Sequence, residues 1–510
     1  ENAGYVSFEN DTAIVSGVAN IFPVFFILIA MLVCMTTMTR MVDEERTQIG
    51  VLKALGYSNM KIMGKYLLYA GSATVIGWGI GFFLCTWGLP LIFWFAYNAL
   101  YDFASLSYLF SPDLAIITLV VSLAGILGST FFSCRKELGR VPAKLIRPRT
   151  AKNGKRILME RITPLWNKLS FLQKITLRNM FRYKKRLIMM LVGISCCTGL
   201  VVTAFGVRDS MTGVGTLQYE TIQKYDMEAT FETGLEEEIY AKLNEMEEIE
   251  NYLACSVHRV DVFGSASINS VNMMSFKELD EISDFWGFYQ GEKEISLPEK
   301  GEAIINRKIA EKLSLSVGDS FEIRNADMQS CTVIVSGIFD NYINNFVVVS
   351  PETYEESFEE WEVNTALIEV KETIENTEDI AKMLTGMEEI KSVSQLSTTK
   401  ENVDSALSCL NYIIWLVVLF AGALAFIVIF NLTNINLAER SREIATVQVL
   451  GFYPKETESY VLRENLVLSI LAGFIGLPLG TLFHRIVMSM ILIDNLTFDL
   501  QVTPLSYGLS

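Results

Sequence analysis

Residue patterns that build catalytic and metal sites are scarce in this chain of 510 residues. It has no GxxxxGKS or GxxxxGKT loop, which excludes binding of ATP phosphates in the P-loop manner. It has only two histidines, His258 and His484, and neither a CxxC pair nor a GxSxG elbow. A zinc knuckle, a catalytic triad and a hydrolase nucleophile are therefore unsupported. We expect no catalytic residue, no metal ligand and no cofactor bound by this chain.

Disulfide bonding has little support, because only Cys255 and Cys331 among the eight cysteines lie away from apolar blocks. A disulfide between these two and a pair of small buried thiols both remain open. Charged side chains are nearly absent from the centres of the apolar blocks. An ion-coupled carrier usually keeps a charged group at that depth, so transmission of force suits this chain better.

What the chain does have is apolar sequence, 51% of its residues, gathered into six long blocks. A helix that spans a bilayer needs about 20 apolar residues. The blocks cover residues 17–40, 64–90, 113–134, 187–208, 407–433 and 458–486. The sequence therefore predicts an α-helical integral membrane protein.

The charges between the blocks are separated by sign, which predicts the orientation of the spans. Residues 135–186 hold 17 Lys+Arg against 2 acidic residues, whereas residues 210–405 hold 14 against 40. Because short cytosolic loops are rich in Lys and Arg, we place 135–186 in the cytosol and 210–405 outside the cell. The basic segment contains no nucleic-acid reading motif, so we expect no nucleic-acid partner.

The acidic region 210–405 is predicted to fold as an extracellular α/β domain, since it is rich in β-branched and aromatic residues. Helices and strands are assigned from the period of their apolar residues. The expected strands are Phe321–Arg324, Thr332–Phe339, Asn345–Val349 and Ala366–Val370, and the expected helices are Glu236–Met246, Glu302–Leu313 and Thr377–Leu384.

A segment near the start of the chain is repeated near its end. Val42–Gly56 (VDEERTQIGVLKALG) aligns with Leu437–Gly451 (LAERSREIATVQVLG) at a constant offset of 395 residues. The register continues into the next apolar block, where Gly81 meets Gly476. An even number of predicted crossings separates the copies, so the repeat is parallel, and an inverted-repeat carrier is disfavoured.

Each copy of the repeat predicts a short cytosolic helix between two spans. Glu44 and Gln48 are four residues apart and would share a helix face, and Gly56 and Gly451 stand where a C-cap is expected. Such a helix is suited to being pushed by a partner protein. The alternative is a solvated inner loop, and two copies in register favour the docking helix.

Further segments match one family in combination. They are MTRMVDEERTQIGVLKALGYSNMKI, NLAERSREIATVQVLGF, LQKITLRNMFRYKKR, RVPAKLIRP, GEAIINRKIAEKLSLSVGDSFEI and VSGIFDNYINNFVVVSPETY. Together they resemble the FtsX-like permeases, the membrane subunits of MacB-type ABC transporters, in the large tandem form of Gram-positive bacteria. The resemblance covers nearly the whole chain.

The resemblance implies two FtsX-like transmembrane modules in parallel repeat with a MacB-like extracellular domain. The first module lacks its first span and the second lacks its last, so we read the sequence as a piece of a longer protein. The expected parts are the end of a missing extracellular domain (1–16), the first module (17–134), a basic linker and elbow helix (135–186), a transmembrane helix (187–209), the extracellular domain (210–405) and the second module (406–510).

The resemblance also implies a partner. A separate dimer of P-loop ATPase subunits would use ATP and Mg²⁺ below the membrane, and this chain would not be an enzyme. Coupling helices at 43–55 and 439–450 would transmit the motion. The residues expected to contact the ATPase are Glu44, Glu45, Arg46, Gln48, Ile49, Glu439, Arg440, Arg442, Glu443 and Ile444.

The segment before the fourth span resembles the elbow helix of the family. At about 100° per residue, its basic side chains fall within roughly 80° of arc, which suits a helix lying on anionic lipids. These basic residues are Lys174, Arg178, Arg182 and Lys185. A plain positive-inside flank is the alternative, and the two interpretations are compatible.

The family places the chain in a bacterial plasma membrane as the permease of an ATP-driven exporter or extractor. Its substrates would be amphipathic lipids, lipoproteins or peptides. The alternative is a machine that transports nothing and instead activates a cell-wall hydrolase or senses an antimicrobial peptide, with an extracellular protein or peptide as partner. A membrane receptor without any ATPase is a third interpretation. The sequence does not name a substrate.

Overall fold

The computed structural model describes most of the chain and divides it into two compact units. The described residues are 3–101, 106–146, 174, 178, 184–232, 236–276, 282–358, 361–371, 377–439, 445, 449, 453–491 and 496–510. Unit 1 comprises Glu1–Ala13, Asp209–Ser408 and Leu492–Gln501, and unit 2 comprises Ile14–Arg208, Cys409–Ile491 and Val502–Ser510.

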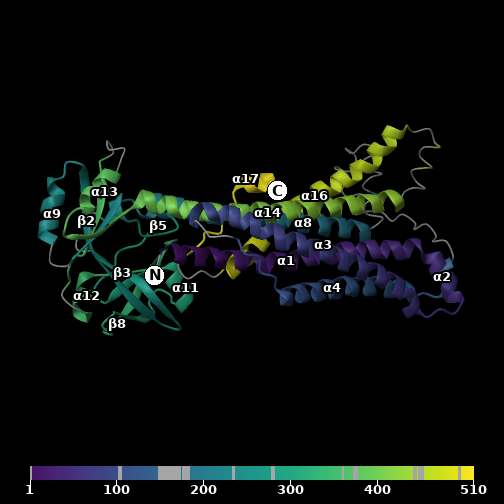
Figure 1. The fold of residues 1–510 in the computed structure, drawn as a ribbon, viewed down its shortest axis with the longest axis horizontal. Helices are drawn as coiled ribbons and strands as arrows, with labels where there is room; N and C mark the ends of the chain where they lie inside the picture. The colour runs from purple at the N-terminus through teal and green to yellow at the C-terminus, as the bar shows by residue number, and fades with distance from the viewer. Residues whose placement is uncertain are drawn as a thin grey trace. The chain divides into compact units, whose positions relative to one another are not determined.

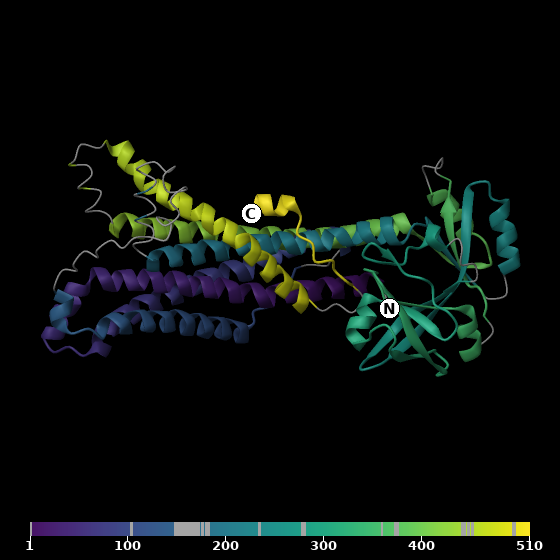
Figure 2. The ribbon, with the colours of Figure 1, turned by 180° about the vertical axis from the view of Figure 1, so that it is seen from behind.

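Unit 2 is built from long helices that run side by side in both views (Figure 1, Figure 2). Its long helices are α1 (Ala3–Glu44), α3 (Asn59–Tyr101), α4 (Pro112–Leu138), α8 (Lys184–Thr216), α14 (Leu396–Glu439) and α16 (Pro454–Met490). Short helices are α2 (Arg46–Ala54), α5 (Pro142–Ile146) and α17 (Pro504–Leu509). Helices α1, α8 and α14 extend beyond the bounds of this unit.

Six helices within the described residues are long and apolar enough to cross a membrane, and each overlaps one predicted block. They are Val15–Glu44, Asn59–Phe95, Pro112–Arg135, Leu187–Ile222, Asn411–Asn431 and Asn465–Met490. Many of their large apolar side chains are exposed, such as Trp87 at 73% and Phe474 at 69%. In water such a surface would be costly, whereas in hydrocarbon it is the expected outer face. The chain is therefore a multi-pass membrane protein.

Small residues bring α8 and α16 into close contact. Ser195, Gly199 and Thr203 follow one another at intervals of four on α8. A Cβ added to Gly199 would lie 3.4 Å from the backbone nitrogen of Gly480 on α16. The Thr203 hydroxyl donates to the Gly480 carbonyl at 3.2 Å, and the Ser195 hydroxyl donates to the Ala472 carbonyl at 2.8 Å. Small side chains and hydroxyl hydrogen bonds of this kind hold helices together in membranes.

Unit 1 contains a mixed nine-stranded sheet among the described residues. Its order is β11-β1-β10-β2-β3-β9-β6-β8-β7, with β3–β9 and β6–β8 parallel and the other pairs antiparallel. The strands are β1 (Met227–Phe231), β2 (Ile249–Phe263), β3 (Ser267–Phe276), β6 (Glu302–Asn306), β7 (Ser320–Arg324), β8 (Ser330–Phe339), β9 (Phe346–Val349), β10 (Thr365–Val370) and β11 (Ile390–Gln395). A separate hairpin pairs β4 (Tyr289–Gln290) with β5 (Lys293–Glu294).

Two apolar cores lie along this sheet. One packs α9 (Glu236–Glu245) and α13 (Glu378–Thr385) on β1, β10 and β11. The other packs α11 (Arg307–Leu313) on β2, β3 and β6 to β9. The remaining short helices are the π-helix η2 (Leu217–Ile222), α10 (Ile282–Phe285) and α12 (Pro351–Ser357).

The secondary structure expected for this unit is correct except at one segment. The predicted strands within Phe321–Val370 are all present, and the helices at Glu236 and Thr377 lie within one or two residues of their predicted bounds. Glu302–Leu313, predicted as one helix, is strand β6 followed by α11. Ala303, Ile304 and Ile305 are all fully buried. A short run that is buried on both faces cannot be assigned to helix or strand by periodicity.

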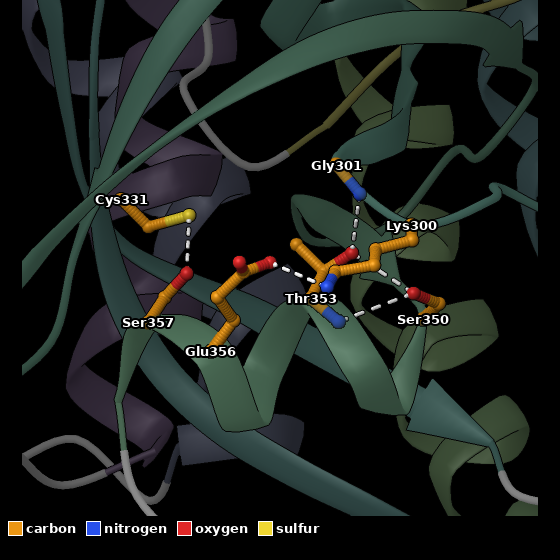
Figure 3. Close-up of polar contacts among 7 residues, drawn as sticks. All are labelled: Lys300, Gly301, Cys331, Ser350, Thr353, Glu356 and Ser357. Atoms are coloured by element: carbon orange, nitrogen blue, oxygen red, sulfur yellow. Dashed lines mark hydrogen bonds and ion pairs between the residues drawn. The ribbon is translucent and has the colours of Figure 1, made fainter.

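Helix α12 is tied to the start of β6 by its N-terminal residues (Figure 3). The Ser350 hydroxyl accepts a hydrogen bond from the backbone N–H of Thr353 at 3.3 Å and so caps the helix. The Thr353 hydroxyl accepts from the backbone N–H of Gly301 at 2.8 Å. At the other end of the helix, the Ser357 hydroxyl donates to the sulfur of Cys331 at 2.9 Å. Both Cys331 and Cys255 are free thiols.

Candidate functional site

Helix α2 lies at one end of the helices of unit 2, where the first coupling helix was predicted (Figure 1). It begins at Arg46 rather than at Asp43, because α1 continues to Glu44. Glu45 separates the two helices with φ −85° and ψ 7°. Glu44 therefore closes α1, where it pairs with Arg40 at 2.8 Å, and it does not share a helix with Gln48 as expected.

Glu45 ties this break to the start of α3. Its Oε2 accepts hydrogen bonds from Lys65 Nζ and from the Tyr66 hydroxyl, each at 2.7 Å. The hydrogen bond from Lys65 is the larger cause, and that from Tyr66 the second, of a pKa below the usual value for Glu45. The ionised carboxylate therefore ties the junction of α1 and α2 to α3.

One face of α2 is clamped onto α5. Arg46 donates to the carbonyls of Leu145 at 3.1 Å and Lys144 at 2.6 Å. From the last turn, Lys53 donates to the carbonyls of Leu138 and Arg140, the latter at 2.8 Å. These cations satisfy carbonyl groups that the ends of α4 and α5 leave without helical partners.

Apolar packing completes the clamp. Ile49 is 2% exposed and belongs to a core cluster that also contains Val42, Tyr66, Leu138 and Leu145. A Cβ on Gly50 would lie 2.8 Å from Ile146 Cγ1 and 3.1 Å from Leu145 Cβ, so only a glycine allows this approach. Helices α1 to α5 thus meet in one packed end, and α2 is held as a rigid part of it.

The C-terminus of α2 is closed by a Schellman motif at Gly56, which has φ +89°. The Gly56 N–H donates to the Lys53 carbonyl at 3.1 Å, and the Tyr57 N–H donates to the Leu52 carbonyl at 3.1 Å. The predicted C-cap at Gly56 is therefore confirmed. The turn leads directly into α3, which begins at Asn59.

The opposite face of α2 is exposed and largely apolar. At 100° per residue, Thr47, Gln48, Val51 and Leu55 fall within roughly 100° of arc, turned away from Ile49. Val51 is 46% exposed, Leu55 70% and the following Tyr57 53%. We call Val51, Leu55 and Tyr57 the apolar edge of α2.

A small pocket adjoins the apolar edge. It holds about 240 Å³ between α2 and the first turns of α3. Gln48, Leu52 and Tyr57 line it from one side, and Lys61 and Lys65 line it from the other. Glu45 also lines the pocket and pairs with Lys65 there.

Of the residues predicted to contact a partner, some are used in contacts within the chain and one is exposed. Glu45, Arg46 and Ile49 hold α2 in place, and Gln48 is exposed. The charged residues of this segment do not predict the apolar edge. Val51 and Leu55, apolar at i and i+4 on the face away from Ile49, were the signal available.

The second predicted coupling helix falls largely outside the described residues, as do Arg440, Arg442, Glu443 and Ile444. Glu439 is the last described residue of α14. In the elbow segment, Lys174 and Arg178 are helical, Arg182 lies outside the described residues, and Lys185 belongs to α8. The roles expected for these residues stay predictions.

Solved structures with similarity to this chain include a periplasmic region and an extracellular domain. The periplasmic region of MacB from Actinobacillus actinomycetemcomitans is 12% identical over 36% of this chain and 95% of that chain, with a TM-score of 0.25. The extracellular domain of the noncanonic ABC-type transporter YknZ from Gram-positive bacteria is 15% identical over 33% of this chain and 98% of that chain, with a TM-score of 0.23. A comparison with curated proteins found no match.

The family comparison identifies the membrane part of the chain. The model described as "FtsX-like permease C-terminal" matches residues 20–138 and again residues 415–510. The two matches begin at positions 395 apart, which is the offset of the repeated segment. The matched residues include α2 and the pocket beside it. These two segments of the chain are similar to FtsX-like permeases.

Proposed function

We propose that this chain is the permease subunit of an ABC transporter and that α2 receives force from a separate ATPase. The observation that carries the proposal is the division of α2 into a clamped face and an exposed apolar edge. A helix that is pushed must pass the load to its spans without bending. The contacts of Arg46, Ile49 and Lys53 connect α2 to α5 and to the ends of α1, α3 and α4.

The apolar edge is the surface of α2 that would contact the ATPase. Val51, Leu55 and Tyr57 lie outside the candidate spans, so lipid need not cover them. Exposed apolar residues rimmed by polar ones are typical of protein interfaces. The occupant is expected to be an apolar groove of the ATPase, with an acidic group placed toward Lys61.

A parallel repeat of two modules accounts for the arrangement of unit 2. Helix α3 begins at Asn59 and α16 begins at Pro454, again 395 positions apart. Asn431 Nδ2 on α14 donates to Thr37 Oγ1 on α1 at 2.8 Å, and the repeat equivalent of Asn431 is Thr36. Equivalent helices that meet at equivalent depths are expected beside a two-fold axis along the membrane normal. Such a pair would present two coupling helices to an ATPase dimer.

The sidedness of the membrane follows from charge. The basic segment 135–186 and α2 are placed in the cytosol of a bacterial cell, and unit 1 is placed outside. ATP and Mg²⁺ are used by the partner, so this chain is not itself an enzyme. We propose that the motion drives export or extraction of amphipathic lipids, lipoproteins or peptides.

The test is capture of the ATPase by the purified permease, with variants of the apolar edge. Leu55→Asp is expected to abolish co-purification of a P-loop ATPase and stimulation of its activity, while insertion and thermal stability stay unchanged. Val317→Asp is the matched control, because Val317 is 63% exposed on unit 1. Equal capture by Leu55→Asp and the native chain would exclude α2 as the contact.

A further inference from the structure

A cavity of about 480 Å³ lies within unit 1, on the face of the sheet opposite α9 and α13. Met227 and Ala229 of β1 point into the core beneath those helices. Glu228 and Thr230 alternate with them, face the other way and line the cavity. A volume of this size is within the range of small-molecule sites.

Three polar side chains that line the cavity come from adjacent segments. Arg259 on β2 is paired directly across the sheet with Asn272 on β3, so both side chains lie on the same face. The backbone N–H of Asn272 donates to the carbonyl of Asn345 at 2.9 Å, which brings the preceding Asn344 beside them. All three line the cavity. Arg259 and Asn344 are exposed and Asn272 is half-buried, so a ligand can reach them.

The loop that carries Asn344 is held in place by buried amides. Asn344 has φ +64°, in the left-handed region that asparagine adopts more readily than most residues. Its carbonyl accepts from Nδ2 of Asn341 at 3.0 Å and from Nδ2 of Asn306 at 3.4 Å. Asn341 is 1% exposed and Asn306 is fully buried. The position of Asn344 at the cavity is therefore set before any ligand arrives.

Arg259 has no partner although acidic groups are abundant around it in the sequence. Residues 210–405 hold 14 Lys+Arg against 40 acidic residues. Other cations of unit 1 use this excess, as Lys242 does with Glu389 at 2.5 Å. Within the part of the chain that the structure describes, no hydrogen bond or ion pair engages the side chains of Arg259, Asn272 and Asn344. Their N–H donors are therefore open to a ligand.

Carboxyl groups of the chain do not take the place of a ligand on Arg259. Cross-strand pairing leads from Glu228 through β10 to Leu253, six residues before Arg259 on β2. At about 3.3 Å per residue this is about 20 Å, well beyond the Debye length of about 8 Å. Burial also raises the pKa of Glu228 and so disfavours its charge. Asp261, which is closer along β2, accepts from the Ser270 N–H at 2.9 Å.

This set of donors matches a carboxylate. A guanidinium donates two parallel hydrogen bonds to a carboxylate, and neighbouring carboxamides add further N–H donors. One cation beside two neutral amides balances one negative charge. A phosphate monoester carries about −1.5 to −2, which an acidic domain with a single open arginine at this site would repel.

The rest of the cavity indicates what carries the carboxylate. Val257, two residues before Arg259 on the same strand, and Ile343, next to Asn344, offer apolar surface beside the three donors. Further along, hydroxyl groups can pair with the N–H and C=O groups of a peptide backbone, which an acyl chain lacks. The residues that supply them are Thr230, Ser392, Ser394 and Thr399.

We propose that the cavity binds the C-terminal carboxylate of a short peptide whose last side chain is apolar. The carboxylate would pair with Arg259 and accept from Asn272 and Asn344, and the last side chain would lie against Val257 and Ile343. A fatty acid carries the same carboxylate and is the other source of this chemistry. Binding here does not depend on the ATPase contact of α2, so the two are tested separately.

The test is calorimetric titration of the purified full chain with four probes. They are N-acetyl-Ala-Ala-Phe with a free carboxylate, its C-terminal amide, hexanoate and inorganic phosphate. The free acid is expected to bind, and the amide and hexanoate are each expected to bind at least tenfold more weakly. Equal binding of the amide, or no binding of the free acid at millimolar concentration, would overturn the proposal. Hexanoate or phosphate binding as tightly as the free acid would overturn the assignment to a peptide carboxylate.

Variants separate this site from unspecific binding. Arg259→Gln removes the charge and is expected to weaken binding of the free acid at least tenfold. Asn344→Gly keeps the left-handed backbone but removes the carboxamide, and is expected to weaken binding at least threefold. Lys293→Gln is the matched control, because Lys293 is an exposed cation on β5, away from the residues that line the cavity. Thermal unfolding of each variant verifies its fold. Unchanged affinity in the folded Arg259→Gln variant would contradict the proposal.

Discussion

Gly480 on α16 is the position at which the contact with α8 leaves no space for a side chain. A Cβ built there would lie 2.4 Å from Val202 Cβ and 2.8 Å from the carbonyl oxygen of Gly199. Ordinary contact between carbon atoms needs about 3.5 Å, so Gly480→Ala must push the two helices apart by about 1 Å. Neither obstacle is the flexible end of a side chain, so local rotation cannot remove the clash.

The cost follows from the contacts that this separation breaks. Overpacking in a close contact costs about 1–3 kcal/mol. The hydrogen bonds from Thr203 and Ser195 to carbonyls of α16 would lengthen beyond a useful distance, at about 0.6 kcal/mol each. We therefore expect Gly480→Ala to lower the free energy of unfolding by about 2–4 kcal/mol.

The measurement is SDS titration of the purified protein in mixed micelles, followed by intrinsic fluorescence. Gly473→Ala is the control, because a Cβ at Gly473 on the same helix would meet nothing within 4 Å. That control is expected to be neutral or to gain up to about 1 kcal/mol from helix propensity. Equal unfolding of the two variants would refute the close packing of α8 and α16.

Three further predictions concern unit 2. Asn431→Leu removes the hydrogen bond to Thr37 and is expected to lower the free energy of unfolding by about 0.6 kcal/mol in the same SDS titration. An unchanged free energy of unfolding would mean that this contact does not support the two-fold arrangement. The double variant Arg46→Met, Lys53→Met removes the hydrogen bonds between α2 and the ends of α4 and α5. It is expected to reduce stimulation of the ATPase at least tenfold, while the apolar edge still binds the ATPase. Full stimulation by this variant would show that α2 need not be clamped. Because the pKa of Glu45 is lowered, its contribution is present above pH 4.5 and is lost as the pH falls through the folded value. Crosslinking of α2 to α3 should therefore decline in acid in the native chain, but should be independent of acid pH in Glu45→Gln.

The sequence of α2 does not predict which of its faces is buried and which is exposed. Arg46 is charged and Ile49 is apolar, yet both side chains turn inward. Helix α5 supplies carbonyls for Arg46, and α5 with α1, α3 and α4 supplies a core for Ile49. The partners on α4 and α5 lie nearly a hundred residues later in the chain. Periodicity within α2 alone cannot indicate which of its two faces a distant segment will cover.

Long-range partners also decided β6 and the cavity of unit 1. Glu302–Asn306 became a strand because β8 and β9 flank it on both sides. Glu228 and Trp286 come together only when β1 and the segment after α10 are folded onto one face of the sheet. Neither residue belongs to a local motif, so the sequence contained no signal for the cavity.

The sequence by itself determined the membrane spans, the separation of charge between loops and the repeat at an offset of 395 residues. These are properties of the chain in one dimension, since a span needs only enough consecutive apolar residues and a repeat needs only register. Tertiary structure alone decided which side chains of α2 hold it in place and which are exposed, and which residues of unit 1 come together around its cavity. Exposure and pairing depend on contacts between segments that are far apart in the chain, and local composition does not encode those contacts.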